Sequence, residues 1–255
     1  MGAGTESLRF TGEGDMVFPL YDDNPFKLPA RPYITWGLIA LNIAIFLITV
    51  AASEGTRMSV EMSYAVVPAA VTVTTVTHGV GVADLTLITG LFLHGGWEHL
   101  LGNMVYLWVF GDDIEEVLGP ARFFLFYLMA GVGASIVYVV LNPDSVVPLV
   151  GASGAISGVL AAYLMLRPCA KVIVFIWRIV VRIRAYWMIG AWILLQFVLL
   201  AENTSDGVAY AAHVGGFAIG ALLFLVMRPP GLKLFECMAH ETVAFEAEFS
   251  GTRKP

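Results

Sequence analysis

A serine and a histidine each lie near the start of a glycine-rich apolar segment of this chain. Ser153 lies in GASGAISG at 151–158, and His213 lies in AHVGGFAIGALL at 212–223. A serine hydroxyl becomes a nucleophile when a base takes its proton, and an imidazole suits that task near neutral pH. The two residues therefore predict acyl transfer, with Ser153 attacking a carbonyl carbon and His213 acting as general base.

A second polar pair occupies one face of another apolar segment. His99 and Asn103 are four residues apart, so a helix places them on the same side. The tetrahedral intermediate of acyl transfer carries an oxyanion, which needs hydrogen-bond donors aimed at it. We expect the donors to be these two side chains and the backbone N–H of Ser153, at the start of a helix.

The composition indicates that lipid surrounds much of the chain. Hydrophobic residues make up 58% of the 255 positions and charged residues 13%, whereas soluble domains average about 25% charged residues. A membrane-spanning helix needs about 20 mostly apolar residues. Six segments are of this kind: 33–52, 97–117, 123–141, 152–167, 185–201 and 209–227. The predicted fold class is an all-α membrane protein with six transmembrane helices.

The distribution of basic residues predicts in which direction each helix crosses the membrane. Of the 14 Lys and Arg residues, only Arg57 falls on one side of a six-helix arrangement. Cytoplasmic loops carry an excess of Lys and Arg, so both chain termini are predicted to be cytosolic. The helices that carry His99, Ser153 and His213 then all begin at the outer face, which places the three side chains at a similar shallow depth.

Small residues indicate how two of these helices approach each other. Gly154 and Gly158 are four residues apart, and so are Gly216 and Gly220. Pairs of small residues at this spacing let membrane helices pack backbone to backbone. This packing is expected to bring the serine within hydrogen-bond reach of the histidine.

The segments between and beyond the helices have less definite roles. The outer loop at 53–93 is the longest, and its last part at 85–93 is expected to be a re-entrant or interfacial approach to the next helix. The stretch 171–183 mixes apolar residues with arginines and is expected to lie on the cytosolic interface. Residues 1–32 are interpreted as a polar cytosolic segment without a signal peptide, and 229–255 as a cytosolic tail.

The cysteines and acidic residues on the predicted cytosolic side give expectations about a disulfide and about ion pairs. Cys169 and Cys237 are both placed there, where thiols are kept reduced, so no disulfide is expected. Negative charge at the end of the 97–117 helix is disfavoured by the helix dipole. Arg122 or the basic stretch at 171–184 is expected to supply a partner. The acids concerned are Asp112, Asp113, Glu115 and Glu116.

The chain resembles the rhomboid family of intramembrane serine proteases. The resemblance covers about 33–228 and is carried by 151–158 and 212–223, quoted above, and by HGGWEHLLGNMVYLWVFGDDIEEVLG at 94–119. It implies a membrane enzyme that uses a Ser–His dyad without a catalytic Asp. Rhomboids cleave transmembrane protein substrates near the outer membrane face, so the implied function is intramembrane endopeptidase activity.

The resemblance also assigns roles to individual residues. Ser153 matches the nucleophile and His213 the general base, while His99 and Asn103 match residues that line the oxyanion pocket. His94 matches a further position at the start of the same helix.

This sequence departs from the family pattern at several places. Some members carry an aromatic residue one turn after the serine, beneath the histidine, where this chain has Ser157. The His213 ring is then supported differently, or Ser157 forms a hydrogen bond nearby. A Trp-Arg pair found in the first outer loop of some members is absent from 53–93. Glu202 and Asp206 are expected to be solvated rather than catalytic.

These inferences divide the chain into three parts. They are a cytosolic N-terminal segment at 1–32, a six-helix rhomboid-like protease domain at 33–228 and a cytosolic tail at 229–255. The expected partners are the lipid bilayer and transmembrane protein substrates, with no nucleic acid, cofactor or metal. Homo-oligomerisation is left open. The expected location is a prokaryotic plasma membrane, with the active site facing outward.

Other functions compete with this interpretation. A proteolytically inactive relative would bind membrane helices, but such relatives usually lose the serine or the histidine. A metal-dependent enzyme would use His94, His99 and His213, but the first two are five residues apart, which is poor for chelation from one helix, and no HExxH motif is present. A transporter is disfavoured because the sequence shows no inverted repeat.

Overall fold

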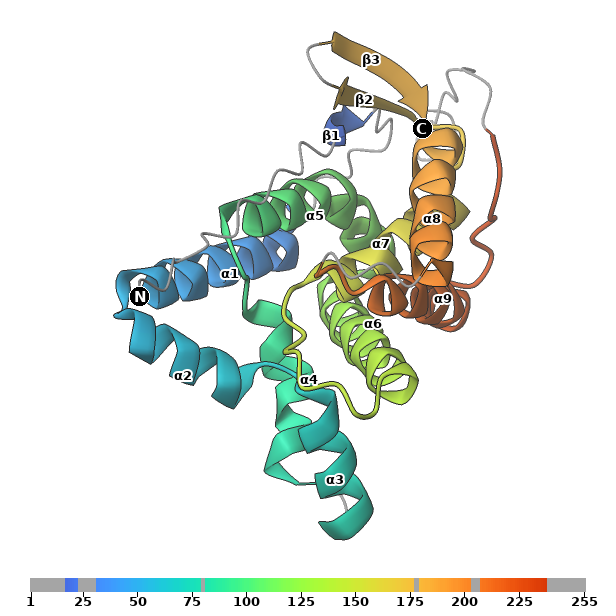
Figure 1. Cartoon of the computed structure of the whole chain (residues 1–255). Helices are drawn as coiled ribbons and strands as arrows, with labels where there is room; N and C mark the ends of the chain where they lie inside the picture. The colour runs from blue at the N-terminus through green and yellow to red at the C-terminus, as the bar shows by residue number, and fades with distance from the viewer. Residues whose placement is uncertain (1–16, 23–30, 79–80, 177–178, 203–206, 238–255) are drawn as a thin grey trace, which may run out of the picture.

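The computed structural model describes residues 17–22, 31–78, 81–176, 179–202 and 207–237, and these are mainly helical (Figure 1). Six long helices occur where the sequence predicts spans, with ends that differ from the predicted ones by at most three residues. They are α1 (Tyr33–Ala51), α5 (Trp97–Leu118), α6 (Pro120–Leu141), α7 (Ser153–Leu166), α8 (Ala185–Ala201) and α9 (Tyr210–Met227).

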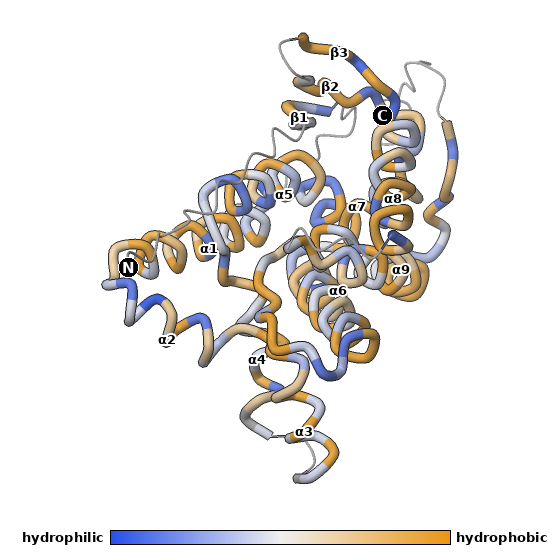
Figure 2. Tube along the Cα trace, in the orientation of Figure 1, coloured by the Kyte–Doolittle hydropathy of each residue, from blue (hydrophilic) through white to orange (hydrophobic). Residues whose placement is uncertain are grey.

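Several helices have the length and surface of membrane spans. Within the described residues, α1, α6 and α9 are both long and apolar enough to cross a membrane, whereas α7 and α8 are apolar but shorter. Figure 2 shows hydrophobic residues along most of α1, α6 and α9. Large apolar side chains point outward on the bundle, including Ile48, Leu222 and Val226, the last of which is 83% exposed. Helices that are apolar on all sides suit a lipid environment.

Helix α7 lies at the centre of the packing. It contacts α5, α6 and α9, and nearly all of its side chains are buried. Aromatic side chains from the neighbouring helices fill the core around it, among them Phe110, Phe126 and Phe224. Small residues dominate its first two turns, which lets the neighbouring backbones come close.

A buried carboxylate joins α5 to the start of α1. Glu115 accepts hydrogen bonds from the backbone N–H groups of Ile34 and Thr35 at 2.9 and 2.7 Å, and from the Thr35 hydroxyl at 2.8 Å. The first N–H groups of a helix lack partners within the helix and carry partial positive charge. A carboxylate therefore satisfies them better than water, which membrane helices exclude.

A second acid near the end of α5 forms an ion pair. Asp113 lies 2.9 Å from Arg167, the residue that follows α7, and its side chain is fully buried. The prediction that Arg122 or the stretch 171–184 would supply the partners of Asp113 and Glu115 is wrong. The helix packing brings the start of α1 and the end of α7 to this point, which the spacing of charges along the sequence does not reveal.

The prediction of an all-α fold is wrong at one end of the molecule. An antiparallel sheet in the order β1–β2–β3 lies there, at the end opposite α3 (Figure 1). Within the stretch 171–183, residues 171–176 and 179–183 belong to two paired antiparallel strands, because β-branched residues dominate them and alternate residues such as Val172 and Val174 are buried. Its place at the membrane interface stays a prediction. The strands are β1 (Val17–Asp22), β2 (Lys171–Ile176) and β3 (Ile179–Arg184).

The first strand attaches the N-terminal segment to the helices. The Tyr163 hydroxyl of α7 donates a 2.6 Å hydrogen bond to the Asp22 carboxylate, and both groups are buried. Residues 1–16 and 23–30 lie outside the described residues, as do 238–255 of the predicted tail. The division into three parts is therefore kept as a prediction.

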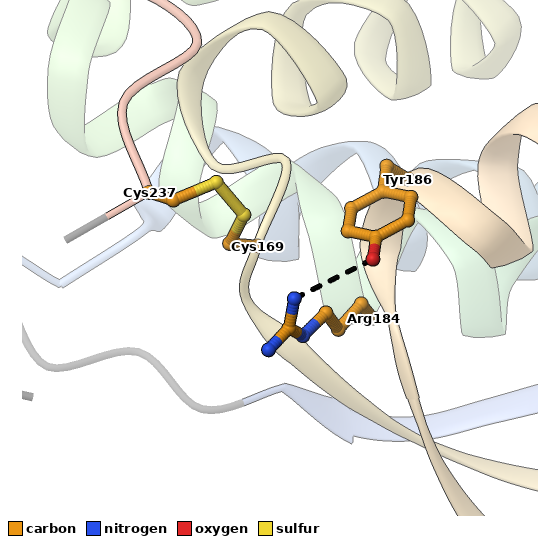
Figure 3. The surroundings of a disulfide bond; sticks show 4 residues. All are labelled: Cys169, Arg184, Tyr186 and Cys237. Atoms are coloured by element: carbon orange, nitrogen blue, oxygen red, sulfur yellow. Dashed lines mark hydrogen bonds between the residues drawn. A yellow bond between two sulfur atoms is a disulfide. The ribbon is translucent and has the colours of Figure 1, made fainter. Parts of the chain in front are cut away.

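The expectation of free cysteines is also wrong, because Cys169 and Cys237 form a disulfide (Figure 3). The chain after α9 folds back along the end of α7, where the Phe235 N–H donates to the Met165 carbonyl at 2.8 Å. This return brings the two Cα atoms within 5.2 Å across 68 residues of sequence. The prediction considered only the redox compartment, and the compartment gives no information about how close the two cysteines lie in the fold.

The loop at 53–93, which the sequence predicts to be on the outer side, is largely helical in its described residues. Backbone hydrogen bonds join this loop to the segment before α7. Val66, in the first half of the loop, and Leu149 exchange bonds of 3.0 and 2.8 Å, and near the end of the loop the Gly90 carbonyl accepts from the Gly151 N–H at 2.9 Å. The re-entrant position of 85–93 stays a prediction. The loop contains α2 (Glu54–Tyr64), α3 (Pro68–His78), η1 (Val82–Leu85), α4 (Thr86–Thr89) and η2 (Gly90–Phe92).

One acidic side chain fixes the start of η1. The Asp84 carboxylate accepts hydrogen bonds from the Gly81 N–H at 2.6 Å and from the Thr75 hydroxyl at 2.9 Å. These bonds favour the charged carboxylate and lower the pKa of Asp84 below its ordinary value.

Replacing Glu115 by glutamine should destabilise the protein. An amide has a single acceptor oxygen, so at least one of the donors at the start of α1 loses its partner in a buried place. We expect Glu115→Gln to cost about 1–3 kcal/mol, measured as a lower thermal unfolding midpoint in detergent. Glu61→Gln is the control, since Glu61 forms an exposed ion pair at 3.9 Å. Equal midpoints for the two variants would contradict the role of Glu115.

Candidate active site

Ser153 and His213 meet in the structure. Ser153 is the first residue of α7, and His213 lies in the first turn of α9. The His213 Nε2 atom is 2.9 Å from the Ser153 Oγ atom, which is hydrogen-bond distance. Both side chains are half-buried. A ring nitrogen at this distance can accept the hydroxyl proton, so the geometry fits an activated serine nucleophile.

Glycines account for the close approach of the two helices. A Cβ atom added to Gly158 would lie 3.2 Å from the Gly216 carbonyl oxygen, and one added to Gly220 would overlap the backbone of Gly158. A Cβ added to Gly216 would overlap the Gly154 carbonyl. The predicted contact between these small residues is therefore present, and it allows the backbones of α7 and α9 to touch.

The two predicted oxyanion residues lie together beside the serine. Gly151 has a φ of +118°, and a Cβ added to it would lie 2.5 Å from the His99 Nε2 atom and 3.7 Å from the Asn103 Nδ2 atom. Both side chains thus reach the backbone two residues before Ser153. The Asn103 Nδ2 group is buried and has no hydrogen-bond partner among the described residues, so it is a donor available to a ligand.

His94 extends this group of polar side chains. Its ring is buried and meets the His99 ring edge to face, with centroids 5.1 Å apart. His94 therefore borders His99, one of the two predicted oxyanion residues.

A glutamine that the sequence analysis did not single out completes the contacts of the histidine. The Gln196 Oε1 atom of α8 lies 2.7 Å from the His213 Nδ1 atom. The sequence did carry a signal, because Gln196 is a strongly polar residue in the middle of the apolar segment 185–201. Such residues are costly in a membrane and need a partner.

Ser157 forms a hydrogen bond within its own helix. Its hydroxyl donates a 2.7 Å hydrogen bond to the Ser153 carbonyl, one turn earlier in α7. Aromatic neighbours of His213 come from elsewhere: the Trp192 ring of α8 lies 5.9 Å from it at 37°, and the Tyr210 ring of α9 lies 6.5 Å from it at 87°. Support of the ring thus comes from α8 and α9, and the Ser157 hydroxyl bonds to the backbone of its own helix.

The remaining candidates are less involved in the site. Glu202 is exposed at the end of α8, and Asp206 lies outside the described residues. Across the described part of the chain, no group of three or more His, Cys, Asp or Glu side chains has a metal-binding arrangement.

Comparison with known proteins shows the family of the chain. The family model described as the Rhomboid domain matches residues 84–230. The chain belongs to the rhomboid family. The matched region begins in η1 and ends just after α9, so the rhomboid domain contains Ser153, His213 and the other site residues described in this subsection.

Several curated rhomboid proteins are similar over this region. The mitochondrial Rhomboid protein 1 of Saccharomyces cerevisiae is 32% identical over 151 residues, covering 55% of this chain and 41% of that protein. The protein YdcA of Bacillus subtilis is 33% identical over 149 residues, covering 57% of this chain and 70% of YdcA. Rhomboid protease GluP of Bacillus subtilis is 45% identical over 78 residues, covering 31% of this chain and 15% of GluP.

These findings confirm the predicted family and a coarse description of the protein. It is a multi-pass membrane protein with a mostly helical rhomboid domain. The chain spans less than half the length of the yeast relative.

A methyl group at Gly220 should separate the serine from the histidine. The added atom would overlap the Gly158 backbone, so α9 must move. We expect Gly220→Ala to cost about 1–3 kcal/mol of stability and to slow labelling of Ser153 by a fluorophosphonate probe on the order of 100-fold. Gly190→Ala on α8 is the matched control, because nothing lies within 4 Å of its added atom. Labelling of Gly220→Ala at the wild-type rate would refute this account of the packing.

Proposed function

We propose that this rhomboid protein is an intramembrane serine endopeptidase. The observation that carries the proposal is the 2.9 Å contact between Ser153 Oγ and His213 Nε2. Ser153 attacks the carbonyl carbon of the scissile peptide bond while His213 takes the hydroxyl proton. His213 then returns the proton to the leaving amine, which leaves an acyl-enzyme ester on Ser153. The same imidazole deprotonates a water molecule that hydrolyses the ester.

The oxyanion of each tetrahedral intermediate needs donors on the opposite side of the serine. The Asn103 amide and the His99 ring, which converge on Gly151, support this assignment. The backbone N–H of Ser153 begins a helix and has no acceptor within the helix. These donors become more valuable as negative charge develops on the carbonyl oxygen.

The proposed topology has six spans with both termini in the cytosol. The bounds of the six long helices and the distribution of Lys and Arg support it, whereas the Cys169–Cys237 disulfide, which a reducing cytosol disfavours, is an observation against it. Helices α5, α7 and α9 each carry site residues in their first two turns. In this topology those turns lie near the outer face. We propose that residues 33–228 form the protease domain between the cytosolic segments 1–32 and 229–255.

The proposed substrates are transmembrane proteins, cleaved near the outer face of the membrane. A prokaryotic plasma membrane is the proposed location, and neither a metal nor a nucleic acid enters the reaction. The relative named Rhomboid protease GluP lends support to the reaction class.

An inactive membrane-helix-binding protein is the alternative function. It would not need a serine held in hydrogen-bond contact with a histidine, and this chain has that contact. A fluorophosphonate probe distinguishes the two functions, because it labels an activated serine only.

Substitution of the serine tests the proposed function. Ser153→Ala should lower kcat for a transmembrane peptide substrate by at least about 10⁴-fold. The measurement uses purified protein in detergent or vesicles. Ser157→Ala is the matched control: the same change one helical turn later removes only the hydroxyl that bonds to the Ser153 carbonyl. Hydrolysis that persists in Ser153→Ala would exclude this serine as the nucleophile.

Removal of the buried amide tests the oxyanion assignment. Asn103→Ala deletes a donor that has no protein partner among the described residues. We expect kcat to fall about 10²- to 10³-fold with a small change in KM, since the amide acts mainly in the transition state. A change confined to KM would assign Asn103 to substrate binding instead.

A further inference from the structure

We propose that Gln196 is a positioning residue that holds His213 in the tautomer Ser153 requires, so that the site works as a Ser–His–Gln triad. This inference rests on the proposed function. The carrying observation is the 2.7 Å contact between Gln196 Oε1 and His213 Nδ1, on the side of the ring opposite Ser153.

The direction of this hydrogen bond determines the chemistry of the ring. An amide oxygen only accepts, so Nδ1 must carry the hydrogen and donate it. A neutral imidazole has one N–H group, and its Nε2 atom is then left with a free lone pair. That lone pair is 2.9 Å from the Ser153 Oγ atom and is ready to accept its proton. The opposite tautomer would point a hydrogen at the serine and could not act as a base.

The surroundings of Gln196 make the contact persistent. Its side chain is 6% exposed, on a helix whose other residues are mainly apolar. An amide group left without a partner in an apolar environment is costly, so rotation of Gln196 away from the ring is disfavoured. The contact therefore constrains both partners.

Trp192 adds a second contact from the same helix. It lies four residues before Gln196, hence on the same face of α8, and its ring is 5.9 Å from the His213 ring. The amide fixes an edge of the imidazole while the indole lies beside the ring. Helix α8 thus provides a support that Ser157 of α7 does not provide, since its hydroxyl bonds to the Ser153 carbonyl.

The amide also acts during the proton transfer. When His213 receives the serine proton it becomes an imidazolium, and the positive ring then donates from Nδ1 to a neutral oxygen. A carboxylate at position 196 would favour that charged ring more strongly, and an apolar side chain would favour it less. The substitution series Glu, Gln, Leu should consequently order the pH at which activity is lost on acidification.

The test compares Gln196→Leu and Gln196→Glu with the wild-type full-length chain on a transmembrane peptide substrate. Gln196→Leu should lower kcat on the order of 100-fold with little change in KM. Its acid limb of kcat/KM should move to lower pH. Gln196→Glu should retain most of the activity at neutral and alkaline pH, and its acid limb should move to higher pH. A residue that merely packs α8 against α9 would not move the two limbs in opposite directions.

Controls separate this inference from the proposed function. His99 on α5, whose charge acts on His213, and Tyr210 on α9, whose ring contacts it, are both unchanged in the series. Leu195→Ala alters an exposed neighbour on the same helix and should leave the profile in place. If Gln196→Leu does not fold, the acid limb of the Gln196→Glu pH profile alone tests the triad. An unmoved limb in Gln196→Glu overturns the triad, whereas activity in Ser153→Ala overturns the proposed function.

Discussion

The backbone contact between α7 and α9 is the constraint on which the rest of the site depends. Ser153 and His213 are 60 residues apart and belong to different helices, so only the distance between those helices determines whether they meet. Gly158 and Gly220 set this distance, because a side chain at Gly220 would overlap the opposing backbone. In lipid there is no hydrophobic force between apolar helices, and close packing of small residues takes its place. The first turns of α7 therefore carry both the candidate nucleophile and the glycines that pack against α9.

Charged and covalent links at the far end of the helices complement this contact. Glu115 is 16 residues after His99, about 24 Å along the same helix, and its carboxylate is bound to the start of α1. The Asp113–Arg167 pair, the Asp22–Tyr163 bond and the disulfide lie near the same end. These links join α1, α5, α7, β1 and the segment after α9 at that end, while the site itself has donors such as the Asn103 amide that no described residue binds.

Features that depend on residue type and spacing could be predicted from the sequence. Contacts between residues that only the folded chain brings together could not. Apolar length located all six long helices, and glycine spacing located the contact of α7 with α9. The strands at 171–176 and 179–184 were missed because apolar residues with arginines suit both an interfacial segment and a strand. The disulfide and the Glu115 contacts were missed because each joins segments far apart in sequence. Gln196 was visible as a polar residue in an apolar helix, but its partner was not.

The contribution of α8 changes how the site as a whole is understood. A dyad requires two helices, and here the second nitrogen of the base is bound by a third, through Gln196. Helix α8 contacts α9 and packs less against α7. Its first turns bury Ala185 and Ile189 in the core, but much of its remaining surface is exposed apolar side chains such as Leu194. After Ile189, Gln196 is the one buried residue of α8, so a displacement of this half of the helix would disturb little of the core, yet it would remove both Trp192 and Gln196 from the ring. The orientation of the base thus depends on the less buried half of α8, and the Gln196 amide is the polar link between this helix and the His213 ring.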